Sequence, residues 1–220
     1  MSEPRIINLF TTPVIAESWP GAAQLNAELH RVILAHEARS KGVTKSNLQG
    51  WQSEIDMLTW GGEAAKHLAT HVVKRCEELT ADIAASGRRR FEWLPEMWAN
   101  VSRRGASNMA HCHPGAFWSA VYYVNDGYGG SSDKALGGEL LLIDPRFPMV
   151  RMRTPDLRYR ASENDYDNQE IWMRPHTGLL VMFPSWLFHS VMPYLGNGAR
   201  ISIAINIVVR AARPVGFANG

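Results

Sequence analysis

The chain has 220 residues, of which 45% are hydrophobic and 20% charged, a composition typical of a globular protein. Its formal net charge of +2 gives no strong attraction to nucleic acid or to an anionic membrane. No apolar run reaches the ~18 residues of a membrane-spanning helix, and the N-terminus lacks a signal-peptide pattern. The two cysteines, Cys76 and Cys112, make no disulfide framework, so we expect a reducing, cytoplasmic location.

Two amphipathic helices are predicted in the first part of the chain, after an extended stretch at residues 5–15. Apolar residues recur at helical spacing over about residues 21–40 and again over about residues 63–86. In the second segment the apolar stripe runs from Leu68 to Ile83. Gly42 and Gly87 follow the two segments and suit helix ends.

From Phe91 onward, short β-rich runs replace the helical pattern. Glycine, proline and asparagine separate them, and no helical segment lies between them, which favours a sandwich or barrel over a parallel sheet. We expect one domain over residues 1–220, with a strand and two helices (1–88) packed against a β-rich body (89–220). The polar connection from Val150 to Glu170 is long enough to predict a functional lid or a disordered segment. The runs cover residues 96–102, 117–124, 138–143, 178–183 and 200–209.

The stretch M-A-H-C-H-P-G places His111 and His113 two residues apart. On a strand, residues i and i+2 point to the same face, so two imidazoles at this spacing can reach one metal ion. Such a pair alone is common by chance, and a loop with two titrating histidines is the simpler interpretation. A third histidine, His189, follows a second apolar run in F-P-S-W-L-F-H.

Arg200 opens the apolar run R-I-S-I-A-I-N, where an unpaired charge is costly to bury. A carboxylate bound by the guanidinium group would offset that cost, and Ser202 lies on the same face of the predicted strand. Together with the three histidines, this pair predicts a metal site next to a carboxylate site. Asn100 and Asn108 are further polar residues for which two roles compete: facing the same cavity or satisfying backbone groups.

The ordered set of motifs resembles the iron(II)- and 2-oxoglutarate-dependent dioxygenases, and most closely an uncharacterised bacterial branch of about this length. The resemblance extends over nearly the whole chain. It rests on L-F-T-T-P-V, S-N-L-Q-G-W-Q-S, H-C-H-P-G, Y-Y-V-N, G-G-E-L, I-D-P-R, F-P-S-W-L-F-H, H-x-V-x-P and R-x-S.

This resemblance implies a mainly β fold, the double-stranded β-helix or jelly roll, with the N-terminal helices packed against it. It implies Fe(II) held by His111 and His189 and 2-oxoglutarate as cosubstrate, bound by Arg200 and Ser202. One tyrosine of the Y-Y pair, Tyr122 or Tyr123, would hydrogen-bond the cosubstrate, and the sequence does not choose between them. The substrate, a small molecule or a peptide, is not indicated, and exposed edge strands are compatible with a homodimer.

The third metal ligand departs from the pattern of the wider superfamily, which has Asp or Glu where this chain has His113. Three interpretations compete. The site has three histidine ligands, a carboxylate such as Glu139 or Asp144 completes it, or two histidines bind the metal and the third position is left to water or chloride. We favour the first, because His-x-His matches His-x-Asp position for position.

Two other functions fit the same residues. A three-histidine metal dioxygenase that does not use 2-oxoglutarate would not need Arg200. A jelly roll that binds a metal or ligand without turnover would keep the fold and not the reaction. The remaining histidines have simpler interpretations: His67 and His71 on a solvated helix face, and His176 in a turn.

Overall fold

The computed structural model describes residues 5–83, 91–146, 156–163 and 165–212, and this part of the chain is mainly β. Three α-helices, one 3-10 turn and eleven strands make it up. In chain order they are β1 (Ile15–Ser18), α1 (Ala22–Glu37), β2 (Asn47–Leu48), β3 (Trp51–Gln52), α2 (Met57–Trp60), α3 (Gly62–Leu79), β4 (Phe91–Ser102), β5 (Ser107–His111), β6 (Trp118–Asn125), η1 (Lys134–Leu136), β7 (Leu140–Ile143), β8 (Glu170–Met173), β9 (Leu179–Pro184), β10 (His189–Val191) and β11 (Arg200–Ala211).

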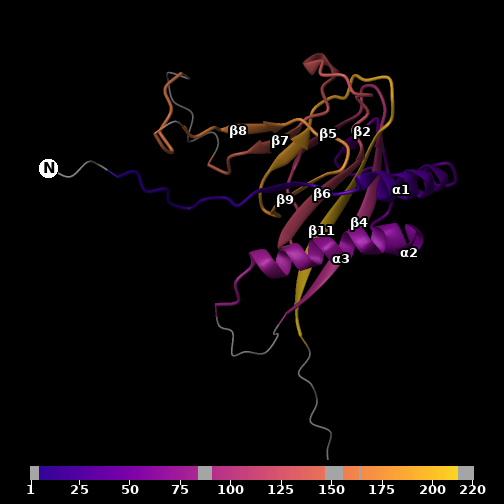
Figure 1. Ribbon diagram of the computed structural model, residues 1–220, viewed down its shortest axis with the longest axis horizontal. Helices are drawn as coiled ribbons and strands as arrows, with labels where there is room; N and C mark the ends of the chain where they lie inside the picture. Colours follow the sequence, from indigo (N-terminus) through magenta and orange to yellow (C-terminus); the bar gives the residue numbers. More distant parts are fainter. Residues whose placement is uncertain (1–4, 84–90, 147–155, 164, 213–220) are drawn as a thin grey trace, which may run out of the picture.

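The strands form two antiparallel sheets (Figure 1). The six-stranded sheet has the order β1-β9-β6-β11-β4-β3, and the five-stranded sheet has the order β2-β5-β10-β7-β8. Strands distant in sequence are therefore neighbours, as in a jelly roll, and the predicted fold class is confirmed. The two longest strands, β4 and β11, pair along their whole length from Arg200↔Ser102 to Ala211↔Phe91.

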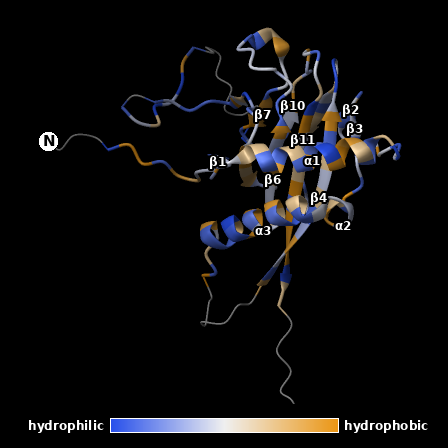
Figure 2. Ribbon diagram, turned by 45° about the vertical axis from the view of Figure 1, so that its right-hand side comes forward, coloured by the Kyte–Doolittle hydropathy of each residue, from blue (hydrophilic) through white to orange (hydrophobic). Residues whose placement is uncertain are grey.

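The helices cover one face of the six-stranded sheet (Figure 2). Leu29 of α1 and Leu68 of α3 are fully buried in one cluster with Ile203 and Ile205 of β11. Because alternate residues of a strand point to opposite faces, the residues between these isoleucines face the other sheet. That inner face carries Arg200, Ser202, Ala204 and Asn206, and all four line a cavity between the sheets.

Helix α3, which corresponds to the second predicted helix at about residues 63–86, is shorter than predicted. It ends at Leu79, because Thr80 has extended backbone angles, and the Thr80 hydroxyl instead accepts a hydrogen bond from Trp118 Nε1 at 2.9 Å. Ile83, which the helical pattern included in the apolar stripe, is fully exposed. Gly87, the predicted helix end, lies outside the described residues.

The predicted division near residue 88 does not separate the strands. β1, β2 and β3 all come from the N-terminal part, and they extend both sheets. This integration and the shared core favour one domain over residues 1–220, which stays a prediction. Of the predicted lid, residues 150–155 and 164 lie outside the described residues, and the rest includes a bridge between Arg160 and Tyr166. Among the described helices, none is long and apolar enough to cross a membrane.

Candidate metal centre

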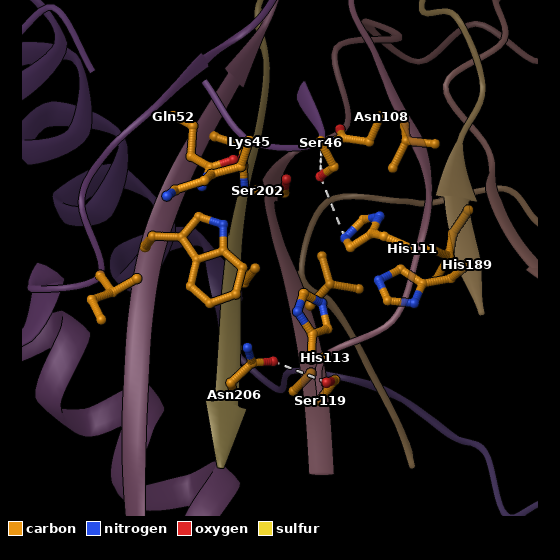
Figure 3. Close-up of a pocket in the computed structure, with 18 of the residues that line it drawn as sticks. Lys45, Ser46, Gln52, Asn108, His111, His113, Ser119, His189, Ser202 and Asn206 are labelled. Atoms are coloured by element: carbon orange, nitrogen blue, oxygen red, sulfur yellow. Dashed lines mark hydrogen bonds between the residues drawn. The ribbon is translucent and has the colours of Figure 1, made fainter. Parts of the chain in front are cut away.

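His111, His113 and His189 converge in the cavity between the sheets (Figure 3). One ligand atom from each ring lies within 4.8 Å of the others. The ring centroids are 4.4 Å apart for His111 and His189, 4.9 Å for His111 and His113, and 5.0 Å for His113 and His189. Such convergence brings three imidazole nitrogens within reach of one ion.

The backbone positions these rings from two neighbouring strands and one loop. His111 ends β5 and pairs directly with His189, which begins β10. His113 lies beyond the end of β5, where its backbone N–H donates to the Ser185 carbonyl at 2.9 Å. The prediction of a strand through both histidines is therefore wrong at His113, although the predicted convergence of the two rings is present.

Hydrogen bonds orient two of the imidazoles. His111 Nδ1 lies 2.7 Å from the Met109 carbonyl oxygen, and His189 Nδ1 lies 2.9 Å from that of Leu187. A carbonyl oxygen can only accept, so Nδ1 is the donor in each ring and Nε2 is the nitrogen left to face a metal. Backbone contacts of this kind commonly fix metal-binding histidines in position.

Burial also keeps two of the rings neutral. Burial, together with a smaller contribution from the neighbouring His111, lowers the pKa of His189 to about 3 and that of His113 to about 4. Near neutral pH both imidazoles are therefore unprotonated. Metal binding requires this form, so no proton has to leave either ring first.

A second group of polar side chains lies in the same cavity. Arg200 is 2% exposed, and its guanidinium carbon lies 5.0 Å from the centroid of the Tyr123 ring. Among the described residues, Arg200 Nε and Nη2 and the Tyr123 hydroxyl have no hydrogen-bond partner. The pKa of Tyr123 is raised, because the effect of burial exceeds the opposing effect of the Arg200 charge. Buried donors that lack a protein partner are costly, so this end of the cavity is suited to an anion.

The register of β6 separates the two tyrosines that the sequence left undistinguished. Tyr123 of β6 pairs with Ser202 of the neighbouring strand β11, and both residues face the cavity. Tyr122 faces the helices, where its hydroxyl donates to Asn26 Oδ1 at 2.6 Å. Only Tyr123 is therefore placed to reach a ligand in the cavity.

Glu139 and Asp144, the carboxylates considered as third ligands, do not join the three histidines within the described part of the chain. Asp144 pairs with Arg146 at 2.6 Å, and Glu139 pairs with Arg174 at 3.4 Å. These ion pairs give both carboxylates another role, so the geometry favours His113 as the third ligand.

The cavity has a volume of about 390 Å³, and sequence reasoning missed much of its wall. Of the two roles considered for Asn100 and Asn108, the structure supports the cavity-facing one, since both line the cavity, and the Asn108 amide donates to Ser46 Oγ at 3.2 Å. Ser46 Oγ in turn lies 3.4 Å from His111 Nε2. Trp98, one of the tryptophans that the sequence assigns to the core or to a pocket wall, lines the cavity. The missed residues come from several segments: Lys45, Ser46, Gln52, Glu54, Glu96, Ser119 and Asn206.

His67, His71 and His176 make their contacts away from this cavity. His71 Nε2 lies 2.5 Å from Glu17 Oε1, which links α3 to β1, so its helix face is not simply solvated. His67 packs edge-on against Trp19. His176 Nε2 lies 2.8 Å from Ser18 Oγ, in keeping with its predicted structural role.

Fold and site together define a jelly-roll protein with a three-histidine centre and a buried arginine in one cavity. The family model described as "Putative 2OG-Fe(II) oxygenase" matches residues 96–206, half of the chain. The chain therefore belongs to the 2OG-Fe(II) oxygenase family, whose cofactors are Fe(II) and 2-oxoglutarate. A sequence search of curated proteins gives no match.

Solved structures with the same fold include three oxygenases. A Trichoplax adhaerens prolyl hydroxylase, in complex with a hypoxia inducible factor peptide fragment, is 16% identical, with a TM-score of 0.59 over 89% of this chain and 83% of its own. The Pseudomonas putida prolyl-4-hydroxylase is 17% identical, with a TM-score of 0.57 over 90% and 93%. HygX from Streptomyces hygroscopicus, with nickel, 2-oxoglutarate and hygromycin B bound, is 12% identical, with a TM-score of 0.58 over 90% and 83%. These similarities establish the double-stranded β-helix fold.

Proposed function

We propose that this protein is an iron(II)- and 2-oxoglutarate-dependent oxygenase in which His111, His113 and His189 hold the metal. The observation that carries the proposal is the buried Arg200 guanidinium, which lines the same cavity as the histidines and has two nitrogens without a protein partner. A protein that bound only metal would not need this buried cation. A dioxygenase that did not use 2-oxoglutarate would not need it either.

The residues present fit both cofactors. Two imidazoles have their Nδ1 protons held by backbone carbonyls, so each offers Nε2 to a metal. Arg200, Ser202 and the Tyr123 hydroxyl offer hydrogen-bond donors to the cosubstrate carboxylate that lies away from the metal. When bound, iron and 2-oxoglutarate would supply hydroxylation of a substrate C–H bond with O₂ as the oxidant, one oxygen atom entering the product and the other entering succinate as 2-oxoglutarate loses CO₂.

The chain itself contributes position, charge and exclusion of water. Three imidazole ligands add no negative charge to a divalent ion, so the centre stays more positive than one with a carboxylate ligand. That charge favours a dianionic cosubstrate, and Arg200 adds to the attraction. Phe183 and Leu140 line the cavity and are buried, and their apolar surface keeps water from the reaction centre.

Anaerobic titration of the Fe(II)-loaded protein with 2-oxoglutarate tests the proposal. We expect a metal-to-ligand absorption band and measurable binding heat, both lost in Arg200→Ala and kept in Arg210→Ala, an exposed arginine on the same strand. Absence of band and heat in the wild type would reject the proposal. Binding without oxygen-dependent succinate formation, even with substrate present, would favour a binding module instead.

We also propose that the protein acts in the cytoplasm on a small molecule or a peptide. Support for a reducing compartment comes from Cys76 and Cys112, which are both free thiols. A homodimer formed through edge strands stays a prediction, and sedimentation of the full chain would test it.

A further inference from the structure

The inner face of the six-stranded sheet is arranged in cross-strand rows with different chemistry. One row contains Asn100, Ser202 and Tyr123. This row lies at the proposed cosubstrate end of the cavity. The next contains Trp98, Ala204 and Val121, and the third contains Glu96, Asn206 and Ser119. All nine residues line the cavity. The rows thus change from polar to largely apolar to acidic and polar along β11.

Glu54 joins the second row at the edge of the sheet. β3 pairs with β4 through Gln52↔Asn100, and the pairing continues through a hydrogen bond from Ser53 N to the Ala99 carbonyl at 3.0 Å. Glu54 therefore lies beside Trp98. It is exposed, Glu96 is half-buried, and both line the cavity. We call Glu54, Trp98 and Glu96 the acidic wall.

The acidic wall borders the metal centre. The Trp98 ring contacts that of His113 edge-on, with 5.7 Å between centroids. Figure 3 shows Asn206 and Ser119, the neighbours of Glu96 in its row, on the far side of His113 from Ser202. A substrate in contact with this wall would therefore lie next to the metal and outside the proposed cosubstrate end.

Charge is unevenly distributed along the cavity. Arg200 opens β11, and Lys45 is a second basic residue that lines the cavity. Glu96 pairs with Asn206, six residues further along β11, a distance of roughly 20 Å. Within the described part of the chain, neither Glu54 nor Glu96 forms an ion pair, and Lys45 forms none with them. Arg200 at one end suits an anionic cosubstrate, and the carboxylates of Glu54 in the middle row and of Glu96 at the other end lie in the cavity wall without an ion-pair partner in the described chain.

Asn206 adds a fixed polar group beside Glu96. Ser119 is 2% exposed, and its hydroxyl donates a hydrogen bond to Asn206 Oδ1 at 2.9 Å. This bond orients the amide so that its NH₂ group is left for a ligand. The wall therefore offers two carboxylates, an aromatic face and one amide donor.

We propose that the substrate carries a cationic nitrogen, an ammonium or guanidinium group, which the acidic wall binds beside His113. Carboxylates accept charge-assisted hydrogen bonds from such a group, and the Trp98 ring stabilises a cation close to its face. The inference rests on the proposed function, because it names the class of substrate that would be oxidised in the same cavity. The binding of a cation depends only on the charged and aromatic side chains of the cavity wall.

Isothermal titration of the metal-free full chain with matched probes tests this inference without any turnover. The probes are the N-acetyl amides of lysine and arginine, with those of norleucine and glutamate as uncharged and anionic counterparts. We expect at least one cationic probe to bind about tenfold more tightly than norleucine, and the glutamate probe to bind least. That preference should weaken as salt concentration rises, because charges at a half-exposed site are screened.

Variants then assign the preference to the wall. Glu54→Gln/Glu96→Gln should remove it, while Glu170→Gln, which takes one negative charge from an exposed position outside the cavity, should leave it intact. Equal binding of cationic and uncharged probes, tighter binding of the glutamate probe, or no effect of the double substitution would each overturn the inference. Equal binding would indicate recognition of the amide group by Asn206.

The two proposals fail separately. The double variant should bind Fe(II) and 2-oxoglutarate as the wild type does, because neither glutamate lies at the cosubstrate end. If the wild type does not bind 2-oxoglutarate but still prefers cationic probes, the oxygenase proposal fails and the cation site stands. If it binds 2-oxoglutarate without that preference, the reverse holds.

Discussion

The Arg200 guanidinium carbon lies 5.0 Å from the centroid of the Tyr123 ring, and both side chains keep buried polar atoms without partners among the described residues. Two adjacent strands thus bring a cation and a hydroxyl together at a destabilising cost. Costs of this kind are typical of ligand sites, where the ligand completes the missing hydrogen bonds.

Replacing Arg200 by Met should separate stability from function. We expect 2-oxoglutarate affinity to fall on the order of 100-fold, because a buried charged partner is lost. Without cosubstrate, the free energy of unfolding should stay equal or rise, because the buried unpaired guanidinium is removed while its volume is largely kept. Calorimetric titration and denaturant unfolding measure the two effects, and a clear loss of stability would show that Arg200 is structural.

The two tyrosines provide a matched pair of single-atom deletions. Tyr122→Phe removes the hydrogen bond to Asn26 and should lower the free energy of unfolding by about 0.5–1.5 kcal/mol, leaving 2-oxoglutarate affinity unchanged. Tyr123→Phe should weaken 2-oxoglutarate binding and leave stability unchanged or slightly higher, because its hydroxyl has no protein partner in the described chain. The opposite pattern would contradict the assignment of Tyr123 to the cosubstrate.

Iron content of purified variants decides the third ligand. His113→Ala should lower Fe(II) affinity, whereas His113→Asp should retain bound iron, because a carboxylate can replace the imidazole as a ligand. His30→Ala, on the opposite side of the helix-covered sheet, serves as the control and should bind iron normally. If His113→Ala retains full affinity, the site has two histidine ligands, and the third position belongs to another group.

Acidification should destabilise the metal-free protein through its buried histidines. The pKa of His189 is lowered to about 3 and that of His113 to about 4, so the unfolded chain takes up protons near pH 6.5 while the folded chain does not. Stability should therefore fall as pH drops from about 6.5 towards 4. In His189→Gln this dependence should be weaker than in the wild type, as denaturant unfolding at pH 7, 6 and 5 would show. Identical slopes would mean that His189 is accessible to protons.

Local pattern predicted a β-rich sandwich or barrel, and the family resemblance carried by short motifs implied the jelly roll and the metal-binding histidines. Strand periodicity identified the β-rich body, and charged or metal-binding residues in apolar runs marked His189 and Arg200. The choice between Tyr122 and Tyr123 required the register of β6 against β11, which no local pattern encodes. Glu54 could not be assigned for a related reason, since its position depends on pairing between segments distant in sequence.

The length of the second helix was wrong for a different reason. Apolar residues continue at helical spacing as far as Ile83, but the chain turns away at Thr80, whose hydroxyl contacts Trp118. Tertiary contact overrides helical periodicity at this point. The same limit explains His113, where the strand ends before the motif does.

Along β4 and β11, residues that pack against the helices alternate with residues that line the cavity, so fold stability and ligand selectivity depend on different side chains. Met97, Ala99 and Ile203 point towards the helices, and Trp98 and Ala204 point into the cavity. Adjacent positions in the chain thus meet different physical demands. Outward residues hold the helices against the sheet, and inward residues set the shape and charge of the cavity, so a substitution at an inward position should change what the cavity binds more than it changes the fold.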